Sequence, residues 1–427
     1  MSKKKICSIV LIVLLLLFPS AHFLIKEEKP VILRFGMFSD SNWNAKSDNT
    51  ARILEVAIRK FEKIHPEVKI SVETGIRKKD YTEWLEGEFL TGKEPDVFMV
   101  PTDTFNVLAS KGALLELEKF MKEDAIDKSG FYQAAIISGQ YERKQYALPY
   151  EAVPLLMRVN TSLLYKNDIE VPENNWTWGD FHAICRKVTK DNNGDGRLDQ
   201  FGVYNYTWKD ASYSNGAALF SENGLENHVS NQDVINAVKF FYKINALSDG
   251  YEVSKRDFEM GNVVFSPMLL TDYRTYNSYP YKISEYSDFS WTCITMPAGP
   301  QGDNSSEVDT LLAAIAKRSH NKQLAWEFLK LLTYDEEIQR MVACESKGVS
   351  VLKKVTEDSG VYKNVEIDTD LFMLAMEKGV TVPKFSKYKD AVSMMNEGVE
   401  EAMNSDMDIK ASLMTLQKKI DSFLKND

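Results

Sequence analysis

The first part of the chain after residue 30 changes between two spacings of apolar residues. Residues 31–38 and 96–100 are short apolar runs, and residues 68–72 alternate apolar with polar, so each predicts a strand. Between the first two strands, apolar residues recur at three- and four-residue steps, at Leu54, Ala57, Ile58, Phe61 and Ile64. This spacing predicts an amphipathic helix over residues 50–64. This alternation of strands and helices predicts a parallel sheet with helices on both faces.

One capping pattern and several later apolar stripes extend this prediction. Asp80 followed by Glu83 resembles a capping box, which predicts a helix from Asp80 to Leu90. Further apolar stripes predict helices over residues 104–110, 178–189, 232–247, 321–332, 371–377, 389–403 and 409–424. The chain has 427 residues, too many for one compact core, so we expect two or three core-forming units with a helical C-terminus.

The N-terminus has the pattern of an export signal. Lys3, Lys4 and Lys5 precede an apolar run from Ile6 to Phe18, and the apolar character resumes from Phe23 to Ile25. Ile6 to Ile25 is a stretch of 20 residues. Residues 1–25 are therefore either a cleaved signal sequence or an uncleaved membrane anchor. Cleavage after Ala21 would put Pro19 at position −3, which is unfavourable, and 20 residues are about enough to span a bilayer, so the anchor is favoured. The basic residues before this stretch place the bulk of the chain outside the cell.

Composition removes some classes of function. The formal net charge is −10 and no strongly basic stretch follows the N-terminus, which argues against a nucleic-acid partner. Beyond the leader there are three cysteines without CxxC spacing, Cys185, Cys293 and Cys344, so neither a disulfide framework nor a thiolate metal site is expected.

The chain contains no motif that supports catalysis. None of its five histidines belongs to an HExxH pair, and no GxSxG, Walker A or GxGxxG sequence occurs. A glycosidase-type carboxylate pair is defined by its separation in space, which a sequence does not give. We therefore expect a protein that is not an enzyme and that requires no cofactor.

One segment resembles the start of a calcium loop. Oxygen-bearing side chains stand at loop positions 1, 3, 5 and 9 (Asp191, Asn193, Asp195 and Asp199), with Gly196 at position 6. Position 12 is Gly202, where an EF-hand supplies a bidentate glutamate. The alternative is an exposed turn rich in Asp and Asn. A bound calcium ion would brace this loop structurally, without a part in ligand recognition.

Aromatic and polar residues occur together at predicted strand ends and loops: residues 40–43, 101–104, 150–151, 204–213 and 272–274. Loops at the carboxyl ends of parallel strands bind ligands in α/β proteins. A sugar has an apolar C–H face and a rim of hydroxyl groups, so aromatic rings beside Asp, Glu, Asn and Arg suit it.

An ordered series of short motifs resembles the extracellular solute-binding proteins (family 1, maltose-binding-protein-like) of carbohydrate ABC transporters. The motifs span residues 61–70 (FEKIHPEVKI), 94–98 (EPDVF), 146–150 (YALPY), 158–164 (RVNTSLL), 176–181 (WTWGDF), 193–202 (NGDGRLDQFG), 296–300 (MPAGP) and 325–332 (AWEFLKLL). The resemblance covers about residues 31–427. The chain departs from the family in lacking a lipobox cysteine after the apolar run, and residues 261–265 match only loosely.

The resemblance implies an α/β, two-lobed periplasmic-binding-protein-like fold (type II), with mixed sheets flanked by helices. Lobe 1 is expected to hold residues 31–147 and 297–345, and lobe 2 residues 150–292 and 350–427. A carbohydrate would bind between the lobes, at Trp43, Asp103, Glu151, Trp208, Tyr213, Tyr273 and Asp309. Trp43, Trp208 and Tyr273 are the expected stacking residues.

The resemblance also implies partners and a location. We expect a monomer outside the cytoplasm, associated with the cell-surface membrane through its N-terminal segment, that delivers ligand to the transmembrane permease subunits of an ABC transporter. The alternatives are a binding protein for another small solute, a peptide or a polyamine, and a polysaccharide-active surface enzyme. A surface adhesin would predict repeats or a wall-anchoring sequence, and the chain has neither.

Overall fold

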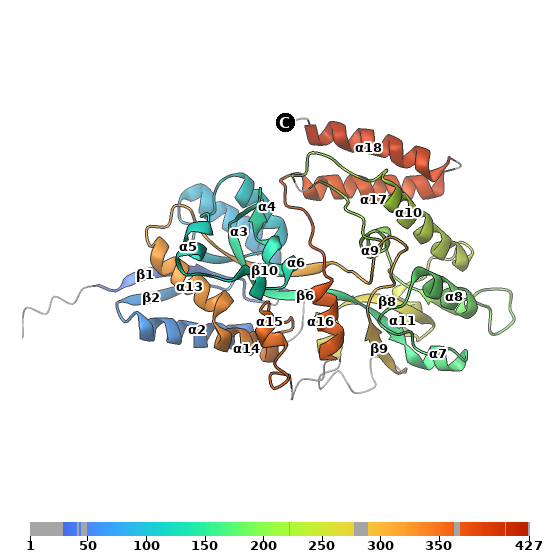
Figure 1. The fold of residues 1–427 in the computed structure, drawn as a ribbon, viewed down its shortest axis with the longest axis horizontal. Coiled ribbons are helices and arrows are strands. Elements are labelled where there is room, and N and C mark those ends of the chain that lie inside the picture. Colours follow the sequence, from blue (N-terminus) through green and yellow to red (C-terminus); the bar gives the residue numbers. More distant parts are fainter. Residues whose placement is uncertain are drawn as a thin grey trace, which may run out of the picture.

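The computed structural model describes residues 29–40, 42–43, 49–221, 223–276, 289–362, 368–405 and 407–425 (Figure 1). Its main sheet has the strand order β2-β1-β3-β10-β6-β8-β7, and β9 also pairs with β6. The strands are β1 (Val31–Gly36), β2 (Val68–Glu73), β3 (Val97–Val100), β6 (Ala147–Asn160), β7 (Phe201–Val203), β8 (Val263–Leu269), β9 (Trp291–Ile294) and β10 (Val308–Ile315). A separate hairpin joins β4 (Gln140–Tyr141) to β5 (Lys144–Gln145).

The first three strands confirm the predicted parallel arrangement. β1 pairs in parallel with both β2 and β3. The helix between β1 and β2, α2 (Thr50–Ile64), has the predicted bounds and buries Leu54, Ala57 and Phe61 of the predicted stripe, whereas Ile64 is exposed. Phe61 packs edge-on against Phe328 at a centroid distance of 5.2 Å, which fixes α2 on the sheet through another helix.

One predicted helix start is wrong. The helix after β2, α3 (Lys78–Thr91), begins with Arg77 as its N-cap, and Asp80 lies in its first turn. The Asp80–Glu83 pattern therefore does not cap this helix. Asp80 instead lies where a negative side chain is favoured by the helix dipole.

The long strand β6 joins the two halves of the sheet (Figure 1). Its first part, residues 147–154, pairs antiparallel with β10, which in turn pairs antiparallel with β3. Its second part, from Leu155, pairs antiparallel with β8 on one edge and with β9 on the other. Because one strand belongs to both halves, bending of β6 changes how the halves face each other.

Helices cover both halves. Those not yet named are α4 (Thr102–Ser110), α5 (Glu118–Glu123), α6 (Gln133–Ser138), α7 (Thr161–Lys166), α8 (Trp178–Val188), α9 (Trp208–Ser214), α10 (Gln232–Asn245), α11 (Lys255–Glu259), α12 (Leu270–Tyr276), α13 (Lys322–Tyr334), α14 (Glu336–Glu345), α15 (Lys353–Thr356), α16 (Thr369–Glu377), α17 (Tyr388–Asn404) and α18 (Ile409–Lys425). Two 3-10 turns occupy Lys128–Gly130 and Ala246–Ser248. The predicted helical C-terminus is confirmed, and α17 and α18 lie together as a pair (Figure 1).

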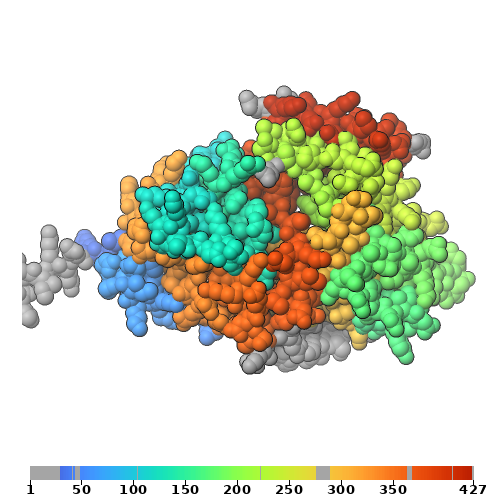
Figure 2. Space-filling view, viewed as in Figure 1, coloured from blue at the N-terminus to red at the C-terminus, as the bar shows by residue number. Residues whose placement is uncertain are grey.

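The buried apolar residues form three clusters. The first gathers residues from β1 to Leu156 and from β10 to α16, together with Met268, Leu270 and Cys293. The second gathers other residues between Met157 and Met296, and the third joins α9 and α10 to α17 and α18. Residues 349–376 pack in the first cluster, and in Figure 2 the orange-red segment that contains α16 reaches the surface between the teal and the green parts. The lobe boundaries given above stay a prediction.

The predicted signal or anchor, residues 1–25, lies outside the described residues. Within the part that the structure describes, helices of sufficient length and apolar character to cross a membrane are absent. Cys185 is buried in the second cluster, as expected from its place in an apolar stripe.

Candidate functional site

The carboxyl ends of several strands meet near the middle of β6. The last residue of β3, Val100, pairs with Leu312, two residues after the Thr310 that pairs with Ala152 of β6. From the other half, the last residue of β8, Leu269, pairs with Leu155 of β6. We call the residues that follow β1, β3, β7 and β8, together with residues 306–310 at the start of β10, the strand-end site. Its position is the one where α/β sheets bind ligands.

A hydrogen-bonded group joins α4 to β10 at this site. Thr102, the first residue of α4, places its hydroxyl 3.3 Å from Asp309 Oδ1 and 3.2 Å from the carbonyl oxygen of Thr310. Asp309 also accepts a hydrogen bond from the Thr310 backbone N–H at 2.8 Å. These bonds hold Asp309 beside the carboxyl end of β3, and its predicted contact with ligand stays a prediction. The side chain of Asp103 lies outside the described residues.

Charged side chains gather around Glu307, just before β10. Burial raises the pKa of Glu307; the nearby carboxylates of Asp309 and Asp210 act in the same direction, while Lys209 and Lys384 oppose them. Burial also raises the pKa of Asp210, against the hydrogen bonds it accepts from Thr207 at the start of α9. The start of β10 and the start of α9 thus bring opposite charges together between the two halves.

The predicted residues of α9 face the C-terminal helices. Trp208 is buried, and its indole N–H donates to Asn396 Oδ1 of α17 at 3.1 Å. Tyr213 lies in the same apolar cluster. Burial raises the pKa of Tyr213 well above its usual range, and Tyr388 and Glu307 act in the same direction. Tyr213 therefore lies near the charged group, and both side chains pack in the apolar cluster.

Trp43 and Tyr273 follow β1 and β8. Trp43 is buried in the first cluster. Tyr273, in α12, is half-buried and meets Trp291 edge-on, with ring centroids 5.6 Å apart and an interplanar angle of 87°. Tyr273 follows the carboxyl end of β8, while Trp291 is the first residue of β9 and pairs with Asn160 at the far end of β6.

Glu151 is engaged by the protein itself in this structure. It is 1% exposed, and its Oε1 accepts hydrogen bonds from the Ser346 hydroxyl at 2.6 Å and from the Gly348 backbone N–H. The carboxylate thus fixes residues 346–348 against β6. A contact with ligand, expected from sequence, is not needed to satisfy it.

Reasoning from sequence missed a set of small polar residues. Their side-chain oxygens are buried and, within the described part of the chain, have no hydrogen-bond partner: Asn42, Asn106, Thr271, Ser306 and Thr310. Asn42 follows β1, Asn106 lies in α4, Thr271 follows β8, and the other two lie at the start of β10. A buried oxygen without a partner is costly. All five residues lie in segments that follow β1, β3 or β8 or that begin β10, and a ligand with hydroxyl groups would supply the missing partners. Small polar residues are common in loops, and only the burial of these five side chains distinguishes them from other loop residues.

The side chains of the segment that resembles a calcium loop form hydrogen bonds within the segment. Asp191 accepts hydrogen bonds from the backbone N–H groups of Gly194 and Gly196, at 2.7 and 2.8 Å. Asn193 and Asp195 each accept a bond from a backbone N–H two residues on, and Asp199 accepts bonds from Asn192. Among the residues that the structure covers, three or more His, Cys, Asp or Glu side chains are nowhere grouped so as to hold a metal ion.

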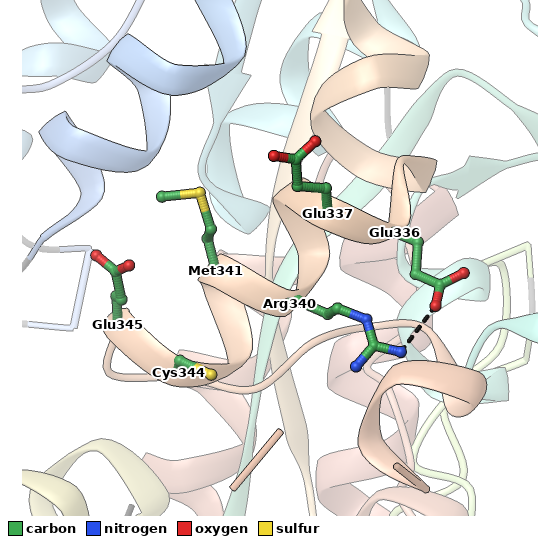
Figure 3. A pocket seen from close by; sticks show the side chains of 6 residues that line it. All are labelled: Glu336, Glu337, Arg340, Met341, Cys344 and Glu345. Carbon is green, nitrogen blue, oxygen red and sulfur yellow. Dashed lines mark hydrogen bonds and ion pairs between the residues drawn. The ribbon is translucent and has the colours of Figure 1, made fainter. Parts of the chain in front are cut away.

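Two surface hollows lie elsewhere. One, of about 480 Å³, is lined by Glu336, Glu337, Arg340, Met341, Cys344 and Glu345 of α14 (Figure 3). The other, of about 430 Å³, lies between α2 and α13 and includes His65, Glu327 and Tyr334. Neither is lined by a residue of the strand-end site.

Known proteins resemble the chain over most of its length. Residues 46–338 match the family model "Bacterial extracellular solute-binding protein". A maltotriose-binding protein of Pyrococcus abyssi (strain GE5 / Orsay) is 22% identical over 403 residues, which cover 90% of this chain and 81% of that protein.

Solved structures give the same result for the fold. A cyclic alpha-maltosyl-1,6-maltose binding protein from Arthrobacter globiformis has a TM-score of 0.78 at 15% identity and covers 93% of this chain and 100% of that one. The sugar-binding protein MalE from Xanthomonas citri has a TM-score of 0.75 at 14% identity, over 92% and 97% of the two chains. The predicted two-lobed, mixed α/β fold is confirmed. With more than half of its length matched by the family model, the chain belongs to the bacterial extracellular solute-binding protein family.

Proposed function

We propose that the protein is the extracytoplasmic substrate-binding subunit of an ABC-type sugar importer. It binds a mono- or oligosaccharide at the strand-end site, between the two lobes, and catalyses no reaction. The observation that carries this proposal is the group of buried, unpaired side-chain oxygens at strand ends from both halves of the sheet.

The chemistry of the site favours a neutral, hydroxyl-rich ligand. Threonine and serine hydroxyls both donate and accept, while the amide oxygens of Asn42 and Asn106 accept, which suits sugar hydroxyls. Tyr273, in the helix that follows β8, adds an aromatic ring for the apolar face of a sugar ring. The relatives named for maltotriose and for cyclic maltosyl-maltose support the same ligand class.

A cationic ligand is less well supported. Glu307, Asp309 and Asp210 would attract a polyamine, but Lys209 and Lys384 lie in the same group and offset them. A polysaccharide-active enzyme would need two carboxyl groups placed on either side of a bond. Membership of a solute-binding family supports binding without turnover.

Ligand binding would work through movement of the lobes. A ligand that contacts both lobes binds the closed arrangement more tightly and so shifts the equilibrium toward it. The closed form then offers the permease subunits a surface that the open form lacks. We further propose that the protein acts as a monomer held at the membrane by residues 1–25.

Thermal unfolding of the full chain tests this function. The panel holds maltotriose, other mono- and oligosaccharides, a short peptide and a polyamine, each with and without Ca²⁺. A ligand at about 100 times its Kd adds about 2.7 kcal/mol of stability. A rise in melting temperature with a sugar alone supports the proposal. A rise only with the peptide or polyamine contradicts it, and a rise with Ca²⁺ alone shows that the chain binds the ion and supports residues 191–199 as its site.

A further inference from the structure

A buried arginine joins α12 to the end of α14. Arg274 is 7% exposed, and its guanidinium donates to the carbonyl oxygen of Gly348 and, over 3.2 Å, to that of Cys344. Cys344 lies in the last turn of α14, where carbonyl groups have no partner within the helix. A cation is stabilised there by the helix dipole. The planar fork of arginine lets one side chain serve both carbonyls.

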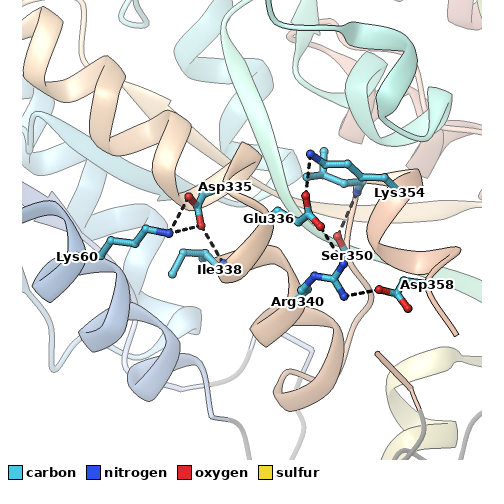
Figure 4. Close-up of polar contacts among 9 residues, drawn as sticks. Lys60, Asp335, Glu336, Ile338, Arg340, Ser350, Lys354 and Asp358 are labelled. Carbon is cyan, nitrogen blue, oxygen red and sulfur yellow. Dashed lines mark hydrogen bonds and ion pairs between the residues drawn. The ribbon is translucent and has the colours of Figure 1, made fainter. Parts of the chain in front are cut away.

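The receiving helix is itself firmly held. Figure 4 shows Lys60 of α2 bound to both carboxylate oxygens of Asp335 at the start of α14, each at 2.9 Å. Further along α14, Arg340 pairs with Glu336 at 2.8 Å and with Asp358 at 2.7 Å. On the inner side, the Gln339 amide donates to the carbonyl oxygen of Tyr150 in β6 at 3.0 Å. Arg274 therefore binds to a fixed part of the molecule.

Gly348 is fixed from the opposite side by Glu151. The Glu151 carboxylate accepts from the Gly348 N–H while Arg274 donates to the Gly348 carbonyl. A methyl group at residue 348 would overlap that carboxylate and lie 2.8 Å from the carbonyl oxygen of Ala152. Hydrogen bonds thus run without a break from α12 through Gly348 to the middle of β6.

The helix that Arg274 holds carries part of the strand-end site. α12 has only seven residues, too few to be stable without tertiary contacts. Its second residue is Thr271, with a buried hydroxyl that lacks a partner in the described part of the chain. Its fourth residue is Tyr273, half-buried against Trp291. The orientation of both side chains depends on what holds α12.

We propose that Arg274 is a positioning residue of the sugar site. Its guanidinium binds backbone carbonyls of α14 and of residue 348, and it sets affinity by keeping Thr271 and Tyr273 in place. This inference rests on the proposed function for the identity of the ligand, but the anchoring of α12 is a property of the unliganded protein.

Two readouts on the full chain test this role. Hydrogen exchange of the backbone amides of residues 270–276 reports on α12 without ligand, and calorimetric titration with maltotriose reports on affinity. In Arg274→Gln, exchange of α12 is expected to be at least tenfold faster, exchange of α18 unchanged, and the Kd at least tenfold higher. Arg274→Lys keeps the charge and one donor direction, so its α12 exchange rate and its Kd are expected to lie between those of the wild type and of Arg274→Gln. Arg256→Gln, at an exposed position of α11, is expected to match the wild type.

The outcomes separate the two ideas. Unchanged exchange of α12 in Arg274→Gln overturns the positioning role, and so does faster exchange with an unchanged Kd. A wild type that binds no sugar overturns the proposed function instead, while the exchange rates still decide whether Arg274 anchors α12. If Arg274→Gln loses protection in α18 as well, it has unfolded globally, and Arg274→Lys is the variant that decides.

Discussion

At the scale of single residues, the site is defined by polar atoms that the protein leaves unpaired. Thr271 is the clearest, because its hydroxyl is buried at the carboxyl end of β8 without a partner among the described residues. An unpaired buried hydroxyl lowers stability, while the same hydroxyl bonded to a ligand adds affinity. Removing it should therefore move stability and affinity in opposite directions.

Thr271→Val tests this trade-off. We expect equal or slightly higher stability to denaturant and a Kd for maltotriose raised about fivefold to tenfold, since a buried neutral hydrogen bond contributes about 1 kcal/mol. The matched control is Thr333→Val, whose hydroxyl donates to the Leu329 carbonyl oxygen at 2.9 Å within α13. That variant should lose about 1 kcal/mol of stability and bind normally. Equal affinity of Thr271→Val and wild type would remove Thr271 from the site.

Glu307 gives the site a pH dependence. Because burial raises its pKa in the folded state, the folded chain holds this proton at a pH where the unfolded chain has released it. Its contribution to stability is therefore complete below the ordinary carboxyl pKa and is lost as the pH rises through the folded pKa.

Glu307→Gln should consequently gain on the wild type as the pH rises. The free energy of unfolding, measured in denaturant at pH 4, 5.5 and 7, is expected to favour the variant more at pH 7 than at pH 4. Glu400→Gln, at an exposed position of α17, serves as the comparison. A difference that stays constant across this range, or shrinks, would contradict the assigned effect of burial.

At the scale of elements, the packing of residues 346–349 against β6 leaves no room for a side chain at Gly348. We expect Gly348→Ala to lower the free energy of unfolding by about 1–3 kcal/mol, the usual cost of overpacking. At Gly87, in α3, an added methyl group would have no neighbouring atom within 4 Å. Gly87→Ala should raise stability by about 0.5–1 kcal/mol because it improves helix propensity. Equal effects of the two substitutions in a denaturant titration would show that residues 346–349 pack more loosely than described.

The long elements were predictable because each carries its own pattern. The apolar residues Leu54, Ala57 and Phe61 mark the buried face of α2, and the apolar run after Asp96 marks β3. Short elements lack that redundancy. α9 and α12 have seven residues each. A capping box of Thr207 and Asp210 marks the start of α9 locally, whereas Arg274 of α12 bonds to Gly348, far away in sequence.

Some residues of the candidate site were expected from the sequence, and others were not. Tyr273 was expected beside a strand end and lies in the helix that follows β8, whereas Asp309 was expected only from the family resemblance and is the second residue of β10. Glu151 was expected at the ligand but bonds to Gly348, a contact 197 residues away in sequence that no local pattern indicates. The unpaired oxygens of Asn106 and Thr310 become visible only when burial is known.

At the scale of the whole molecule, β6 connects the two halves of the sheet and places strand ends from both beside one another. A ligand bound there contacts both halves at once, which is the condition for coupling binding to closure. The proposed function as an importer subunit therefore requires that a single sugar binds between the two halves of the sheet.

Calorimetric titration of the full chain with maltotriose tests that requirement most directly. We predict saturation at one sugar per chain, with weaker binding in Thr271→Val and unchanged binding in Thr333→Val. Binding between the halves is contradicted if a saturating titration leaves Thr271→Val indistinguishable from the wild type, or if neither maltotriose nor any other oligosaccharide binds while a peptide or polyamine does.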